Sequence, residues 1–185
     1  MTAYVPESEF TPPRPDCPHP EHWTAADADS AELEVSELVG VFVRALQPEV
    51  VVETGTAFGQ TAHHIAEALR RNGHGHLWTL EPDPLRADSA QQRLAHLPAT
   101  VVRAESLTYT PRDGIGFAWF DSLTHLRESE FRRYRPHMAP GCIVGFHDCG
   151  PQHPVRVHVE RLAREGLLRP IYLPTPRGVM FAEVL

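Results

Sequence analysis

The chain has 185 residues and no lysine: its 17 basic residues are all arginines, set against 24 aspartates and glutamates, for a formal net charge of −7. Chemistry that needs a primary amine is therefore excluded, namely a Walker-type phosphate lysine, a pyridoxal or aldol Schiff base, and a lysine general base. The negative balance and the lack of a basic run argue against nucleic acid as a partner. We expect a small-molecule ligand.

Long apolar runs are also missing, and none approaches the roughly 18 residues that a membrane helix needs. The first residues have neither the positive nor the apolar region of a secretory signal, so we expect a cytoplasmic protein without a membrane partner. Cysteine is scarce: Cys17, Cys142 and Cys149 form no Cys-x-x-Cys pair, which predicts reduced thiols. The length is that of one domain, and its small size suggests a homodimer.

Proline is concentrated at the start of the chain, with six of the 18 in the first twenty residues. Because proline fixes φ and has no N–H, this stretch disfavours helix and sheet. We expect an extended arm over residues 1–28, able to fold over a ligand as a lid, and one folded domain over residues 29–185. A helix is expected from Asp29, with Glu32 three positions later as in a capping box, to just before Pro48.

Strand and helix patterns then alternate. Val50-Val51-Val52 is an apolar run too short for a helix and typical of a strand buried on both faces. Further strands are predicted over 76–81, 99–104, 116–121 and 142–146, and helices over 61–71, 84–97, 127–138 and 154–165. Two last runs, 167–173 and 179–185, predict an antiparallel hairpin. The expected fold class is α/β, a three-layer sandwich with a Rossmann-like, seven-stranded, mostly parallel sheet and an antiparallel C-terminal hairpin.

The most distinctive local pattern is Glu53-Thr-Gly-Thr-Ala-Phe-Gly59, at a predicted strand-to-helix junction. Glycines at 55 and 59 allow a sharp turn and close approach of a ligand to the backbone. They stand four residues apart, which differs from the G-x-G-x-x-G of dinucleotide sites. Glu81 ends the next predicted strand, where its two oxygens can accept both ribose hydroxyls of a nucleoside.

On these residues the chain resembles the class I S-adenosylmethionine (SAM)-dependent methyltransferases over nearly all of residues 30–185. It is most similar to the small, metal-dependent O-methyltransferase type called methyltransferase family 24, which is related to the cephalosporin-hydroxylase-like and macrolide-sugar methyltransferases. The matching motifs are V-V-E-T-G-T-A-F-G, L-E-P-D from Leu80, W-F-D-S from Trp119 and P-G-C-I-V-G-F-H-D from Pro140. The terminal hairpin also fits, since an inserted antiparallel strand distinguishes this sheet from a dinucleotide fold.

The resemblance implies that SAM is the cofactor. Glu53 would help to hold its amino-acid end, Glu81 its ribose, and the segment around Ser106 its adenine. The complete set of expected cofactor-binding residues is Glu53, Gly55, Thr56, Gly59, Glu81, Ser106 and Asp121.

Asp121 and Asp148 follow the fourth and fifth predicted strands, which a doubly wound sheet places side by side. Two carboxylates there suit Mg²⁺ or another divalent cation. Related metal-dependent families hold that metal with an acid at the fourth strand and an acidic pair after the fifth, and His147 stands where the first acid of the pair is often found. Imidazole shifts the preference toward Zn²⁺, Fe²⁺ or Mn²⁺, or makes His147 a base.

Three interpretations of the group Asp121, His147 and Asp148 stay open: a metal site, a metal-free site in which a histidine takes the proton, and a structural cluster. Catechol-type relatives place a lysine near the transferred methyl group, and this chain has none. A histidine can substitute as the base, His147 first, then His125, then His153. The arginines of the predicted helix over 127–138 are expected on a solvated face, in i,i+4 pairs with glutamates.

We therefore expect a SAM-dependent methyltransferase for a small-molecule acceptor, with oxygen as the methylated atom and a divalent metal assisting. Two other classes stay open. A catalytically silent partner protein could share the fold and its glycine turn, and a nucleotide-binding oxidoreductase would need a dinucleotide glycine spacing that the sequence lacks.

Overall fold

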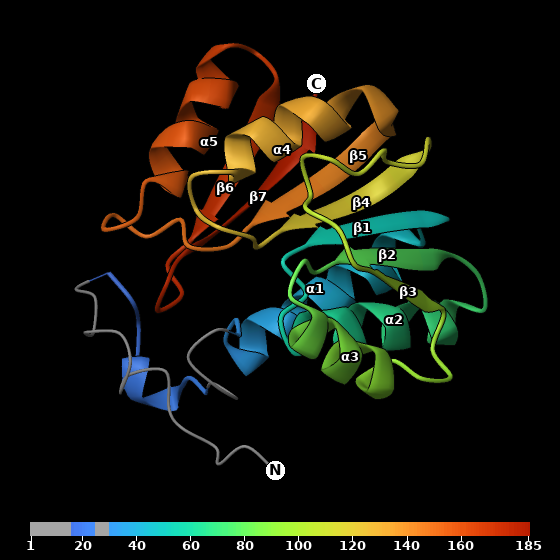
Figure 1. Cartoon of the computed structure of the whole chain (residues 1–185). Helices are drawn as coiled ribbons and strands as arrows, with labels where there is room; N and C mark the ends of the chain where they lie inside the picture. The colour runs from blue at the N-terminus through green and yellow to red at the C-terminus, as the bar shows by residue number, and fades with distance from the viewer. Residues whose placement is uncertain (1–15, 25–29) are drawn as a thin grey trace.

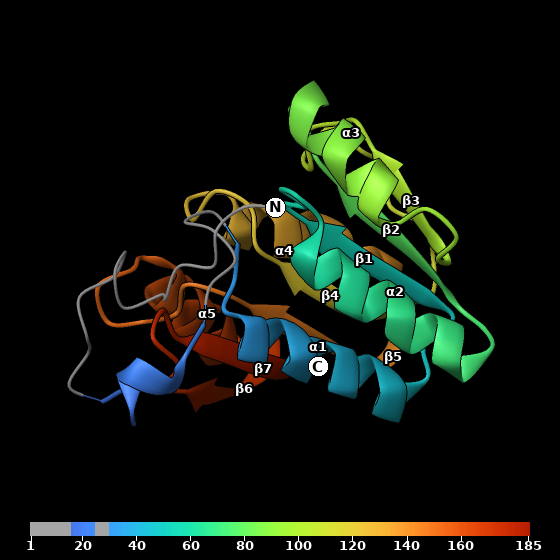
Figure 2. The ribbon, with the colours of Figure 1, turned by 90° about the horizontal axis from the view of Figure 1, so that it is seen from below.

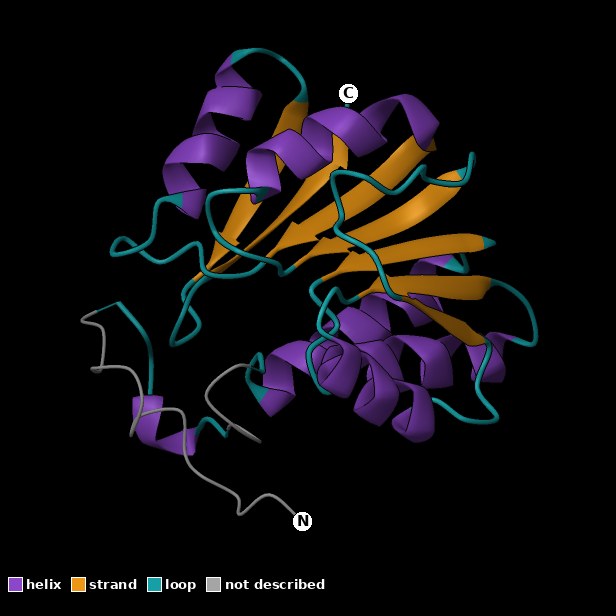
Figure 3. Cartoon of the chain, viewed as in Figure 1, coloured by secondary structure: helices purple, strands orange, loops and turns teal. Residues whose placement is uncertain are grey.

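The computed structural model describes residues 16–24 and 30–185, and the structural statements below concern these residues. One seven-stranded sheet lies between two layers of helices (Figures 1 and 3). The strands are β1 Val50–Thr54, β2 His76–Leu80, β3 Ala99–Val102, β4 Ile115–Phe120, β5 Met138–Phe146, β6 Leu168–Leu173 and β7 Val179–Val184. The helices are α1 Leu33–Leu46, α2 Gln60–Asn72, α3 Pro84–Arg93, α4 Arg127–Tyr134 and α5 Val155–Arg164, with 3₁₀ turns η2 Pro20–His22 and η3 Arg135–His137.

The strand order is β3-β2-β1-β4-β5-β7-β6. Strands β3, β2, β1, β4 and β5 pair in parallel, whereas β7 pairs antiparallel with both β5 and β6. The predicted α/β fold class is therefore confirmed, hairpin included. Among the described strands, β7 is the one that runs opposite to the others. Strand β6 is antiparallel to β7 and therefore has the same direction as β1 to β5.

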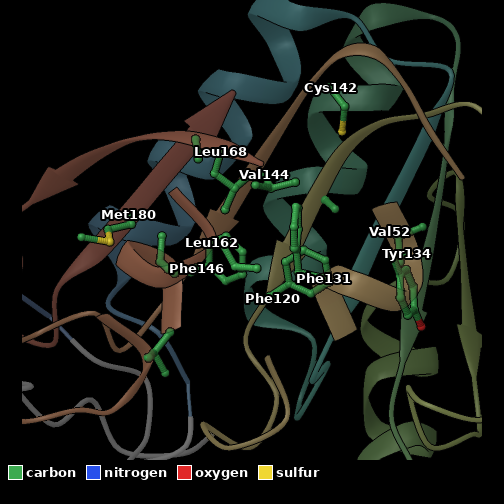
Figure 4. Close-up of a cluster of buried hydrophobic side chains, with 14 of the residues drawn as sticks. Val52, Phe120, Phe131, Tyr134, Cys142, Val144, Phe146, Leu162, Leu168 and Met180 are labelled. Atoms are coloured by element: carbon green, nitrogen blue, oxygen red, sulfur yellow. The ribbon is translucent and has the colours of Figure 1, made fainter. Parts of the chain in front are cut away.

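Both faces of the sheet are buried, which explains the apolar strand sequences. Helices α1 to α3 cover one face, and α4 and α5 cover the other (Figures 1 and 2). Because side chains alternate along a strand, Val51 packs among residues of α1 and α2, and Val52 among residues of α4 and α5. Figure 4 shows the second of these clusters, in which Phe120, Phe131 and Phe146 contact one another.

Several boundaries differ from the sequence predictions. Helix α4 ends at Tyr134 rather than at 138, because Pro136 has no N–H for the next helical hydrogen bond, and β5 begins at Met138 instead of 142. Helix α3 stops at Arg93, four residues early. The predicted cap residue Asp29 lies outside the described residues, and α1 begins at Leu33.

Much of the predicted N-terminal arm, residues 1–15 and 25–28, also lies outside the described residues. Its described part contacts α1 and β6: Thr24 donates two hydrogen bonds to Glu34, and the Tyr172 hydroxyl lies 3.1 Å from an oxygen of Asp16. All three cysteines are free, as predicted. Among the described helices, none combines the length and the apolar character needed to cross a membrane. Homodimer formation and a cytoplasmic location stay predictions.

Candidate functional site

A cleft of about 600 Å³ opens at the carboxyl ends of the parallel strands, a volume typical of small-molecule sites. The residues that line it follow β1, β2, β3, β4 and β5, and the turn between β6 and β7 adds one more. Its polar lining includes Glu81, Ser106, Asp121, Asp148 and Arg177. Open α/β sheets bind ligands at this edge. Residues 16–24, the described part of the predicted N-terminal arm, do not line the cleft.

Gly55 forms the turn from β1 toward α2, with φ at +83°, where glycine is favoured. A Cβ atom at this position would lie 2.3 Å from the carbonyl oxygen of Asp121, so only glycine lets the turn approach the end of β4. Gly59 has φ at +80°, and its Cβ would lie 3.2 Å from the backbone of α3. Thr56 lies behind the turn, with its hydroxyl 2.5 Å from that of Thr79. The structure thus forms the tight turn that the glycine spacing predicts.

Glu81 lies on the cleft wall directly after β2. One carboxylate oxygen accepts a hydrogen bond from the backbone N–H of Ala57 at 2.8 Å, and the other accepts from that of Asp83 at 3.0 Å. These bonds join the glycine turn to the end of β2 and fix the orientation of the carboxylate. A carboxylate oxygen can accept more than one hydrogen bond, so both oxygens can still accept from a ligand.

Glu53 lies beneath this wall and is 1% exposed. Burial, helped by the charges of Asp121 and Glu81 and opposed by a hydrogen bond from the Thr79 hydroxyl, raises the pKa of its carboxyl to about 8. Glu53 is therefore mostly protonated at neutral pH. The resemblance predicts that Glu53 helps to hold the amino-acid end of the cofactor. It would do so as a neutral acid, from behind the cleft wall.

Glu130 of α4 is buried, although the pattern of arginines and glutamates along this helix predicts a solvated face. It accepts hydrogen bonds from the hydroxyls of Thr54 at 3.0 Å, Ser122 at 2.7 Å and Ser106. Burial raises the pKa of this carboxyl, against the opposing effect of the three hydroxyls and of Arg127. Ser106, which is predicted to lie near the adenine, lines the cleft, and its hydroxyl donates to Glu130.

Asp121, His147 and Asp148 come together beyond the ends of β4 and β5, as the sequence predicts. One potential ligand atom from each lies within 4.8 Å of the others. The Nδ1 atom of His147 is 3.1 Å from Asp121 Oδ1 and 3.8 Å from Asp148 Oδ1. Asp148 is held with φ at +54°, a conformation that non-glycine residues seldom adopt.

Arg127 corrects the expectation that the arginines of this helix face solvent. It is the first residue of α4, is 2% exposed, and places Nη2 at 3.1 Å from Asp121 Oδ1 and 2.7 Å from Asp148 Oδ2. It also donates to the backbone carbonyls of Ser122 and His147. Farther along α4, Arg132 is exposed and forms the predicted i,i+4 pair with Glu128.

His147 is fully buried and contacts a carboxylate at each ring nitrogen, because Nε2 lies 2.7 Å from Glu32 Oε2. Burial alone would lower the pKa of this imidazole, but the charges of Asp121, Asp148 and Glu32 outweigh it and raise the pKa to about 10. His147 is therefore an imidazolium at neutral pH, with both N–H groups donated to carboxylates. Glu32, predicted only as a helix-capping residue, is part of this site.

These contacts bear on the predicted divalent cation. The ring nitrogens of His147 offer no lone pair while both donate, both oxygens of Asp148 face arginines, and Oδ1 of Asp121 faces Arg127. A cation bound between the two aspartates would meet the guanidinium of Arg127, and the two positive charges would repel. The arrangement of the described residues does not fit a divalent cation.

His125 and His153 are the other predicted candidate bases. His125 is exposed on the loop after β4, between Thr124 and Leu126, which both line the cleft. His153 precedes α5, outside the cleft lining, and its buried Nε2 has no hydrogen-bond partner among the described residues. His125 is likewise not among the residues that line the cleft, but of these two histidines it is the one whose neighbours along the chain line it.

Comparison with known proteins supports this geometry. A family model described as a methyltransferase domain matches residues 52–149, from β1 to just beyond β5. No curated protein matches the chain. The three solved structures described below are 14% to 22% identical to it, so they establish the fold.

Three of these structures illustrate the similarity. The O-methyltransferase TomG from Streptomyces achromogenes, involved in tomaymycin synthesis and solved with SAM, is 22% identical over 85% of this chain and 82% of its own, with a TM-score of 0.71. The methyltransferase PaMTH1 from Podospora anserina, bound to S-adenosylhomocysteine (SAH), is 14% identical over 86% and 81%, with a TM-score of 0.74. An O-methyltransferase from Bacillus cereus in complex with SAH is 16% identical over 86% and 84%, with a TM-score of 0.69.

Proposed function

The chain belongs to the methyltransferase-domain family, and from this premise we propose that it transfers the methyl group of SAM to an oxygen atom of a small-molecule acceptor. The observation that carries the proposal is the wall of the cleft at which the Gly55 turn meets the carboxylate of Glu81. The similar structures with bound SAM or SAH support the choice of cofactor.

The residues of this wall suit a nucleoside. Glu81 is oriented by two backbone N–H groups, and its remaining acceptor capacity suits the two hydroxyls of a ribose. Gly55 lets the turn after β1 pack against the end of β4, which places the backbone of Gly55 and Ala57 on the cleft wall. Ser106, on the β3 side of the cleft, would face the adenine with its backbone, because Glu130 holds its hydroxyl.

SAM supplies a methyl group on a positively charged sulfur, which is open to in-line attack by the acceptor oxygen. The new C–O bond forms as the C–S bond breaks, its electron pair stays on sulfur, and the hydroxyl proton must pass to a base. The chain therefore has to align the acceptor and to accept that proton.

We assign the role of base to His125. His147 already carries a proton on each ring nitrogen and is fully buried, and the carboxylate of Asp121 is held by Arg127 and His147, which weakens it as a base. His125 is exposed on a loop whose neighbouring residues line the cleft. We infer that His147 positions Asp121 and takes no proton from the acceptor.

Isothermal titration calorimetry with SAM and SAH tests the proposed cofactor. We expect one site, with the affinity for SAH lowered roughly 10- to 100-fold in Glu81→Ala, because hydrogen bonds to a charged acceptor are lost. Asp88→Ala is the matched control, since Asp88 is an exposed acid of α3 that pairs with Arg103 outside the cleft.

The result that would overturn the proposal is the absence of SAM and SAH binding at millimolar ligand. Binding of a nicotinamide dinucleotide instead would favour an oxidoreductase. Tight SAH binding without turnover of any oxygen acceptor in a broad screen would favour a catalytically silent partner protein.

A further inference from the structure

Six charged groups form a closed ring beneath the β4 and β5 side of the cleft. Its ion pairs run from Glu32 to His147, to Asp121, to Arg127, to Asp148 and to Arg177. The backbone N–H of Arg177 then donates to Glu32 at 2.9 Å and closes the ring. Carboxylates and cations alternate around it, so their formal charges cancel.

Arg127 is the member of the ring that holds the two aspartates together. A single nitrogen, Nη2, contacts both Asp121 and Asp148, and the rest of the guanidinium donates to the carbonyls of Ser122 and His147. The side chain is 3% exposed. Swinging it away would remove one donor from each of two carboxylates and two backbone carbonyls of the buried site, so the arginine is part of the folded site.

We propose that the guanidinium of Arg127 takes the place of a divalent cation between Asp121 and Asp148, and that this chain binds its ligands and works without a metal at this site. The part that concerns methyl transfer rests on the proposed function above; the part that concerns metal binding does not. The geometry points to a second consequence: removal of the guanidinium frees the oxygens that it contacts, Oδ1 of Asp121 and Oδ2 of Asp148, for a divalent cation.

The test measures binding of Mn²⁺, a divalent cation that carboxylate ligands coordinate. Binding is followed by electron paramagnetic resonance, on protein from which metals have first been removed with a chelator. The wild-type chain is expected to bind no stoichiometric Mn²⁺ at millimolar concentration, and its SAH affinity is expected to stay the same in excess chelator. Arg127→Ala is expected to bind one Mn²⁺ at least tenfold more tightly than the wild type. The double variant Arg127→Ala/Asp148→Asn is expected to lose that gain.

Arg132→Ala is the matched control, an exposed arginine of the same helix, and is expected to behave as the wild type. If Arg127→Ala does not fold, Arg127→Gln keeps most of the volume and is measured in the same way, with thermal stability against Mn²⁺ concentration as a second readout. Stoichiometric Mn²⁺ binding by the wild type that Asp148→Asn abolishes would overturn the proposal. Failure of both Arg127 variants to gain Mn²⁺ affinity would also overturn it, whereas loss of SAH binding alone would count only against the proposed cofactor.

Discussion

Glu53 and Glu32 are both buried glutamates, one beneath the β1 and β2 side of the cleft and the other beneath the β4 and β5 side. Among the described residues, the side chain of Glu53 has one hydrogen-bond partner, the hydroxyl of Thr79, and burial raises its pKa to about 8, so it is neutralised by a proton. Burial would raise the pKa of Glu32 as well, but the imidazolium of His147 outweighs this and lowers it. Glu32 is neutralised by a cation from a distant part of the chain.

The way in which these two glutamates are neutralised distinguishes the two halves of the site, the β1 and β2 side and the β4 and β5 side. On the β1 and β2 side, turns of a few residues and backbone N–H groups hold Gly55 and Glu81 in place. On the β4 and β5 side, each charge depends on partners from other elements, because an unpaired buried charge is costly. The first half should therefore tolerate single substitutions better than the second.

The largest expected effect is on turnover, for a substitution in the loop after β4, beside the β4 and β5 half of the site. His125→Gln removes the proposed base and is expected to lower kcat by about 10²- to 10⁴-fold while leaving SAH affinity unchanged. Turnover is measured across pH with an acceptor found by screening phenols. His22→Gln, an exposed histidine outside the cleft, serves as the control. Unchanged turnover in His125→Gln would move the role of base to Asp121.

Glu32→Ala tests whether the second half depends on paired charges. It leaves the His147 imidazolium and the backbone N–H of Arg177 without their acceptor, so we expect a loss of about 3–5 kcal/mol in the free energy of unfolding, measured with urea. Glu37→Ala, an exposed glutamate of α1, is expected to stay within about 0.5 kcal/mol of the wild type. A loss of stability as small as that of the control would show that the fold does not depend on the paired charges of the ring.

Glu53→Gln tests the first half and is expected to have the smallest effect. The folded pKa of Glu53 lies above its ordinary value of 4.5, so its contribution to stability is complete below about pH 4.5 and is lost as the pH rises through about 8. The wild type should therefore lose stability between pH 5 and pH 8 while the variant does not. Over this range the free energy of unfolding of the variant should rise, relative to that of the wild type, by at least about 1 kcal/mol, the equivalent of one pKa unit. Unfolding in urea at both pH values measures this; an equal difference at both would mean that Glu53 stays ionised.

Much of the fold could be read from the sequence because its signals are local. Short apolar runs such as Val50-Val51-Val52 mark strands buried on both faces, and the order of the elements implies a parallel sheet. The start of β5 at Met138 was missed, since the strand begins in a stretch that also reads as the end of a helix. Pairing with Ile115 of β4 extends the strand there.

The candidate site divides in the same way. The glycine turn and Glu81 were predictable, because their spacing specifies a backbone conformation and a place at the end of a strand. Arg127 was misread, since an arginine near glutamates on a helix has the same local pattern whether that turn faces water or the sheet edge. Glu32 was misread for the same reason, as its capping pattern concealed a contact with His147.

The sequence alone thus established the class of fold, the edge of the sheet at which the cleft lies, and that Glu81, Asp121 and Asp148 gather there. It could not establish how those acids are neutralised. Glu32 is 115 residues from His147 and 145 from Arg177 along the chain, and only folding brings them within hydrogen-bonding distance. Charge compensation in a buried site depends on distances in space, so only the tertiary structure shows that the guanidinium of Arg127 contacts both Asp121 and Asp148.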